Sequence, residues 1–160
     1  MLGVKIICVG KLKEKYFVDA ANEYIKRLGA YCKLEIEELP ECRLPLNPTQ
    51  KDVESALLEE AERIELRLPS NTAIIALDIE GKMLDSLQLS ELLQRFAAYG
   101  KSRLCFIIGS SIGLHQRIKD RADFRLSMSK MTFPHHLARI MLLEQLYRGF
   151  KIAEGSSYHK

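Results

Sequence analysis

The carboxyl-terminal third of the sequence concentrates side chains that can handle protons and anions. His135 and Arg139 lie four residues apart, as do Glu144 and Arg148, so each pair shares one face if the segment is helical. Glutamate before arginine is also the favourable order for an ion pair on a helix. Such pairs could form an anion-binding and proton-handling face, or could merely keep charges compatible with a nearby apolar surface. Spacing alone leaves both interpretations open.

The last three residues add a second candidate group. Tyr158, His159 and Lys160 offer an aromatic ring, an imidazole and a cation, each of which can grip a base or a phosphate. Chain ends usually fray, so disorder is the default expectation for this tail.

Three loops follow apolar, strand-like runs: residues 77–81, 109–113 and 127–132. In open α/β sheets, ligands bind outside the carboxyl ends of the strands, where backbone donors converge. The loop from Gly109 to Gly113 matches neither the Walker sequence nor the dinucleotide glycine pattern. It is therefore either a ligand-binding loop or an ordinary tight turn.

The elements that must position these residues follow from the hydrophobic pattern. Apolar or alternating runs predict strands at residues 4–9, 33–38, 72–77, 103–108 and 124–128, with 33–38 at an edge of the sheet. Helices are predicted at residues 17–28, 49–68, 85–99, 114–121 and 134–152, with capping boxes at Thr49 with Asp52 and at Asp85 with Gln88. The alternation predicts an α/β fold with a mainly parallel sheet flanked by helices. At this length we expect one domain over residues 1–160.

The helix predicted at residues 134–152 is apolar around most of its circumference. Its apolar side chains are Leu137, Ile140, Met141, Leu142, Leu143, Leu146, Tyr147 and Phe150. A helix of this kind must be buried on more than one side. A second subunit could supply the second side, which predicts a homodimer; the alternative is a central helix within one core.

Charge is distributed unevenly along the chain. Residues 1–100 carry 13 basic and 17 acidic side chains, whereas residues 101–160 carry 11 basic and 4 acidic ones. A polyanion such as nucleic acid would suit the basic end, although a solvated basic surface explains it equally well.

Several classes of protein lack support. No apolar run approaches the roughly 20 residues that span a bilayer, and the amino terminus has no export signal, so we expect no membrane role. The cysteines at positions 8, 32, 42 and 105 have no metal-ligand spacing, which argues against a metal site. Free cysteines within apolar runs indicate a reducing compartment and hence a cytoplasmic protein.

The ending TFPHHLARIMLLEQLYRGFKIAEGSSYHK closely resembles that of the RlmH family. The opening VKIICVGKLKEKYF and the internal LDIEGK and FIIGSSIG are similar to the same family, so the resemblance covers essentially the whole chain. These are SPOUT-class enzymes that methylate the third ring nitrogen of a pseudouridine in bacterial 23S ribosomal RNA. One departure is Ser110, where members commonly carry a second glycine.

The resemblance implies a carboxyl-terminal trefoil knot that binds S-adenosylmethionine, a homodimer, and ribosomal RNA within the ribosome as the partner. One subunit's tail is thought to complete the other's cofactor pocket. The implied cofactor-binding residues are Leu77, Gly109, Ser127, Met128, Ser129, Lys130, Met131, Thr132 and Phe133.

Methylation at a ring nitrogen requires that its proton be removed or the resulting anion stabilised. Arg148 is the candidate for stabilising the anion, while His135, Glu144 and His159 are open alternatives as the base or as groups that orient the substrate. Tyr158, His159 and Lys160 would close the site around the substrate. A transfer RNA methyltransferase and a non-catalytic RNA-binding module are the competing hypotheses.

Overall fold

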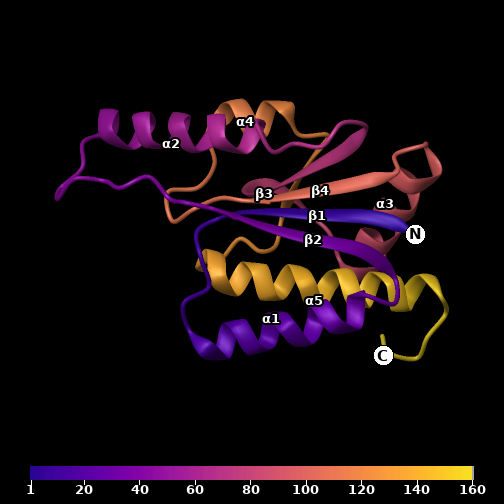
Figure 1. The fold of residues 1–160 in the computed structure, drawn as a ribbon. Coiled ribbons are helices and arrows are strands. Elements are labelled where there is room, and N and C mark those ends of the chain that lie inside the picture. Colours follow the sequence, from indigo (N-terminus) through magenta and orange to yellow (C-terminus); the bar gives the residue numbers. More distant parts are fainter. Residues whose placement is uncertain (160) are drawn as a thin grey trace.

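A five-stranded parallel sheet forms the centre of the computed structural model, which describes residues 1–159 (Figure 1). The strands are β1 (Leu2–Val9), β2 (Cys32–Leu39), β3 (Thr72–Met83), β4 (Arg103–Ile108) and β5 (Phe124–Ser127). Their order across the sheet is β2-β1-β4-β3-β5, and every neighbouring pair is parallel. The predicted α/β fold with a parallel sheet is confirmed, and β2 lies at an edge as predicted.

Helices cover both faces of this sheet. They are α1 (Lys15–Leu28), α2 (Gln50–Glu65), α3 (Ser86–Ala98), α4 (Gln116–Arg121) and α5 (His135–Ala153). Helices α1, α3 and α5 pack on one face, and α2 and α4 lie on the other (Figure 1). Successive residues of β1 point to opposite faces of the sheet. Val4 and Ile6 pack against the layer of α1, α3 and α5, and Ile7 packs against the layer of α2 and α4. Burial on both faces explains why the central strands read as continuous apolar runs.

Both predicted capping boxes are present. The Asp52 amide donates to Thr49 Oγ1 at 3.1 Å, and the Gln88 amide donates to Asp85 Oδ1 at 2.8 Å. Helix α2 ends at Glu65, three residues earlier than predicted, because Pro69 disfavours helical geometry in the residue before it. Pro134 is the extended residue before α5 rather than its first helical residue.

Strand β3 is longer than predicted, since it continues through a polar stretch to Met83. Its pairing with β5 shifts register between Leu77 and Lys82. Gly81 lies in this irregularity, where a Cβ would come within 2.5 Å of the Arg125 carbonyl oxygen. The backbones therefore approach so closely that the position requires glycine.

Helix α5 is enclosed by its own chain on more than one side. It packs against both α1 and α3, with Leu142, Leu143 and Leu146 fully buried. On the α3 side, the Ser90 hydroxyl donates to the Gly149 carbonyl at 2.8 Å. The central-helix alternative thus accounts for much of the apolar circumference, while the homodimer and the trefoil knot stay predictions.

None of the helices within residues 1–159 combines the length and apolar character that crossing a membrane requires.

The Gly81→Ala substitution should reduce the free energy of unfolding by about 2 kcal/mol, because the added methyl group forces β3 and β5 apart. Gly29→Ala is the matched control, since its Cβ meets its nearest neighbour at 3.4 Å, and we expect a change below about 1 kcal/mol. Chemical denaturation of both variants measures the difference. Equal stability of the two would contradict the close approach at Gly81.

Candidate functional site

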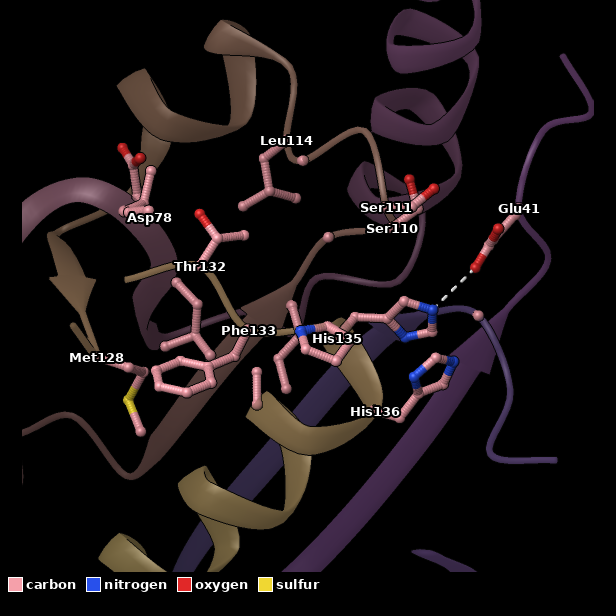
Figure 2. A pocket seen from close by; sticks show the side chains of 18 of the residues that line it. Glu41, Asp78, Ser110, Ser111, Leu114, Met128, Thr132, Phe133, His135 and His136 are labelled. Carbon is pink, nitrogen blue, oxygen red and sulfur yellow. Dashed lines mark ion pairs between the residues drawn. The ribbon is translucent and has the colours of Figure 1, made fainter. Parts of the chain in front are cut away.

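A cavity of about 980 Å³ lies at the carboxyl-terminal edge of the sheet (Figure 2). Residues that follow β1, β2, β4 and β5 contribute to its walls, including Gly10, Pro40, Gly109 and Met128, and residues 77–79 contribute from within β3. The opposite wall is formed by the start of α5. The parallel arrangement therefore produces the concave site that the strand ends predicted.

Most of the residues predicted to hold a cofactor surround this cavity. Seven of the nine line it: Leu77, Gly109, Met128, Ser129, Met131, Thr132 and Phe133. Ser127 is buried beneath them, and its hydroxyl donates to the Ser129 carbonyl at 3.0 Å. Lys130 is exposed and does not line the cavity.

The loop from Gly109 to Gly113 is a tight turn on one wall of the cavity. A Cβ on Gly109 would collide with the carbonyl group of Gly113, and Gly113 itself has a φ of +85°. Both glycines are therefore required by the backbone geometry. The loop is a tight turn and also a cavity wall, so the two interpretations of its sequence are compatible.

Ser110, the departure from the family pattern, is held by a buried carboxylate. Its hydroxyl donates to Glu60 Oε1 at 2.8 Å, and the Cys42 amide donates to Glu60 Oε2 at 2.9 Å. Glu60 lies on α2 and is 3% exposed. It thus connects the loop after β2 to the loop after β4, which form two walls of the cavity.

Asp78 provides a buried carboxylate within β3, just beyond the part of the strand that pairs with β4. Its side chain is 1% exposed and lies 3.4 Å from Lys119 Nζ and 3.6 Å from an Arg125 nitrogen. The Glu80 amide donates to Oδ1, whereas Oδ2 has no hydrogen-bond partner among residues 1–159. Oδ2 is the oxygen that faces Arg125, so the carboxylate balances the charges of Lys119 and Arg125 beside the cavity.

His135, at the start of α5, faces the cavity from the side opposite β3 (Figure 2). Its Nε2 lies 3.1 Å from a carboxylate oxygen of Glu41. Burial is the main cause that lowers the pKa of His135 below its ordinary value of 6.5. The neighbouring His136 lowers this pKa further, and Glu41 opposes the shift. The ring is therefore neutral at pH 7. With Nε2 donating to Glu41, its Nδ1 is left as an acceptor.

Arg139 fixes the start of α5. It is 3% exposed, and its guanidinium donates to Glu38 at 2.7 Å and to the Gly10 carbonyl at 3.1 Å. Gly10 has a φ of +119°, and a Cβ there would come within 2.6 Å of both Glu41 and His135. The ends of β1 and β2 are thereby held against α5.

The other predicted catalytic residues form a separate group further along α5. Arg148 donates to Glu144 at 3.0 Å, and the Tyr158 hydroxyl donates to the same carboxylate oxygen at 2.9 Å. The Arg148 guanidinium lies 4.7 Å from the Tyr158 ring centroid and 3.2 Å from His159 Nδ1. The tail thus folds back onto α5 as far as His159. Lys160 lies outside the described residues.

One chain does not bring all the predicted catalytic residues together. Glu144, Arg148, Tyr158 and His159 are absent from the cavity lining, which His135 joins. Nine residues of helix separate His135 from Glu144, which corresponds to about 13 Å along the axis. The predicted catalytic residues therefore form two separate groups within one chain.

Sequence reasoning missed Glu41, which lines the cavity, and Glu60, which supports two of its walls. Glu41 and Glu60 gave no local signal, because their partners are His135 and Ser110, far away in the sequence. Within residues 1–159, no group of three or more histidine, cysteine or acidic side chains has the arrangement of a metal site.

Comparisons with known proteins agree along the full length. Residues 2–159 match the family model described as "Predicted SPOUT methyltransferase". The chain is 47% identical over 159 residues to proteins named ribosomal RNA large subunit methyltransferase H from Pelotomaculum thermopropionicum and Clostridium novyi. It is 45% identical to the one from Bacillus pumilus. Each alignment covers 99% of this chain and at least 99% of the relative.

A solved structure shares the fold. It is described as that of a probable methylase family protein from Haemophilus influenzae, with a TM-score of 0.55 and 14% sequence identity. The match covers 100% of this chain and 72% of the other.

Acidification should destabilise the protein partly through His135. Because its pKa is lower in the folded chain, the unfolded chain binds this proton more readily. The contribution to stability is complete above pH 6.5 and is lost as the pH falls toward the folded pKa. His135→Gln cannot titrate, so its Tm should fall less between pH 7 and pH 5 than that of the wild type.

Glu41→Gln should change the pH dependence of Tm in the direction opposite to His135→Gln. Glu41 raises the pKa of His135, so its removal should lower that pKa further and enlarge the fall in Tm over the same range. Thermal unfolding of the three proteins at both pH values measures the effect. Equal falls in all three would contradict a role for His135 burial.

Proposed function

This chain belongs to the SPOUT methyltransferase family, and from that premise we propose that it methylates N3 of a pseudouridine in 23S ribosomal RNA, with S-adenosylmethionine as methyl donor. Full-length similarity to ribosomal RNA large subunit methyltransferases is the observation that carries this assignment. A ribosomal substrate implies that the enzyme works in the cytoplasm.

The cavity fits S-adenosylmethionine in size and chemistry. Its volume lies within the range of small-molecule sites. Leu77, Leu114 and Phe133 line the cavity and offer apolar contact to a purine. Between Ser127 and His135 the chain forms neither helix nor strand, so the backbone donors and acceptors there are not used in regular secondary structure and can bind a ligand. Bound in this cavity, S-adenosylmethionine supplies an electrophilic methyl group.

His135 is the base that the geometry favours. The acceptor imide is only weakly acidic, so a neutral group near the cavity must accept its proton, or the anion must be stabilised. His135 meets the first requirement because its lowered pKa keeps the ring unprotonated, with Nδ1 free of the Glu41 contact. Glu144 and His159 lie outside the cavity of their own chain.

Arg148 is suited to stabilise the anion. Its hydrogen bond to Glu144 raises the pKa of the guanidinium, which stays charged at every physiological pH. The same carboxylate accepts from Tyr158, whose pKa is raised by burial and by Glu144, so the hydroxyl remains a donor. The arginine is therefore held in place before a substrate arrives, which favours electrostatic catalysis.

A homodimer would unite the two halves of the site. Ile79 and Met131 line the cavity and are exposed apolar side chains, and the exposed Met83 pairs with Ser127 of β5. Exposed apolar surface of this kind favours burial by a second protein surface. We propose that a second copy covers it and brings its own Glu144, Arg148 and tail to this cavity.

Transfer of labelled methyl groups to ribosomes that lack the modification tests the proposal directly. We expect labelling of 23S ribosomal RNA, and mass spectrometry should place the added methyl on N3 of a pseudouridine. Labelling of free transfer RNA instead would assign the enzyme to another substrate. Stoichiometric binding of S-adenosylmethionine without labelling of any RNA would overturn the assignment.

Deletion of residues 158–160 should lower kcat/KM for methylation at least about 100-fold while leaving the dimer intact. The deletion removes the ring beside Arg148 and the groups that close the site, but none of the buried residues of α5. Tyr158→Phe, which keeps the ring and loses only the hydrogen bond to Glu144, is the matched control and should be far less impaired. Activity assays and analytical ultracentrifugation measure the two properties. Loss of the dimer on deletion would contradict this division of roles.

A further inference from the structure

A row of aromatic rings leads from the protein surface into the cavity. Tyr16 and Phe17, around the start of α1, have ring centroids 4.7 Å apart. Phe17 stacks on His136 at 5.7 Å with an interplanar angle of 17°, and His136 lies 4.0 Å from His135. Both histidines line the cavity, where they lie side by side (Figure 2).

The outer end of this row is open to solvent. Tyr16 is 65% exposed, so burial in the core does not explain its position. Phe17 and His136, in contrast, are partly buried and connect the start of α1 to the start of α5, which lie at the same end of the molecule (Figure 1). The inner rings therefore have a packing role, whereas Tyr16 presents an aromatic surface outward.

Basic side chains accompany the rings. Lys11 and Lys13, in the loop between β1 and α1, are exposed and line the mouth of the cavity, and Arg43 lies on another part of the rim. Lys15 follows, with Asp19 as its ion-pair partner at 2.7 Å. Residues 11–15 carry three lysines against one acid, Glu14. The mouth of the cavity thus combines positive charge with an exposed ring.

We propose that Tyr16, with Lys11 and Lys13, forms a docking surface for an unpaired stretch of RNA beside the nucleotide that is methylated. A base would stack on the Tyr16 ring, and the adjoining phosphates would contact the two ammonium groups. This inference rests on the proposed function, because it supposes that the cavity receives a nucleotide.

The combination of groups favours RNA over other polyanions. Phosphate contacts alone would require only the lysines, whereas an exposed ring next to them suits a nucleobase, which has a π face. Sequence-specific and single-stranded RNA sites commonly use such rings, because unpaired bases can be splayed out and stacked. Within residues 11–17, Lys11 and Lys13 line the cavity, and Tyr16 is connected to it through the rings of Phe17 and His136.

Tyr16→Ala in the full-length protein tests the stacking contact. We expect the KM for unmodified ribosomes, and the Kd for a short unpaired oligoribonucleotide, to rise roughly 5- to 100-fold. Tyr16→Phe should behave as the wild type, because stacking needs the ring and not the hydroxyl. Tyr99→Ala is the matched control, since Tyr99 is 81% exposed at the far end of α3 and should leave both values unchanged.

Salt dependence tests the lysines. If Lys13 contacts a phosphate, Lys13→Ala should reduce the slope of log K for the oligoribonucleotide against log salt by about 0.7. Affinity of the Tyr16→Ala variant for S-adenosylmethionine, measured by calorimetry, should match that of the wild type. A loss of cofactor affinity in that variant would assign Tyr16 a structural role and overturn the docking surface.

The two proposals fail differently. If the wild type transfers no methyl group to ribosomes, the proposed function is wrong. If the wild type is active and Tyr16→Ala retains its KM and Kd, only the docking surface is wrong. Equal weakening by Tyr16→Phe and Tyr16→Ala would likewise exclude stacking on the ring.

Discussion

The buried guanidinium of Arg139 holds together the parts of the chain on which the cavity depends. A buried charge is costly unless it is paired, and Arg139 finds its partners in Glu38 at the end of β2 and in the Gly10 carbonyl after β1. These contacts fix where α5 begins. They thereby place His135 beside Glu41, and they leave residues 128–134 to span from β5 to α5 as a wall of the cavity.

Glu60 is a buried charged group that holds loops in place on the other face of the sheet, as Arg139 does on the first. It reaches from α2 to the loops that follow β2 and β4, so each layer of helices contributes a buried charged group that supports the cavity walls from behind. Ser110 belongs to this arrangement, because its hydroxyl supplies one of the two hydrogen bonds to the carboxylate. The serine at this position is therefore accommodated by a contact with α2. Since both acceptor oxygens of Glu60 are used, the two loops are held in a fixed relation to each other.

Local signals made most of the fold predictable, whereas long-range contacts did not. Thr49 and Asp85 could be recognised because a capping box depends on residues only three apart. The extension of β3 to Met83 could not, because a polar edge segment becomes a strand only through its pairing with β5. In the site, the strand ends and the family resemblance indicated the cavity walls. The pairing of Glu60 with Ser110 joins residues 50 positions apart and left no pattern in the sequence.

The rigidity of α5 determines how a complete site can form. Its start bears His135 in the cavity, and its second half bears Glu144 and Arg148, about 13 Å and about 20 Å further along the axis. Arg139, Leu142, Leu143 and Leu146 are buried between these points, so bending or melting the helix would expose the core. A local movement therefore cannot bring Arg148 to the cavity of its own chain. If both groups act on one nucleotide, the second half of the site must come from another copy, whose own Arg139 contacts hold its α5 in the same way.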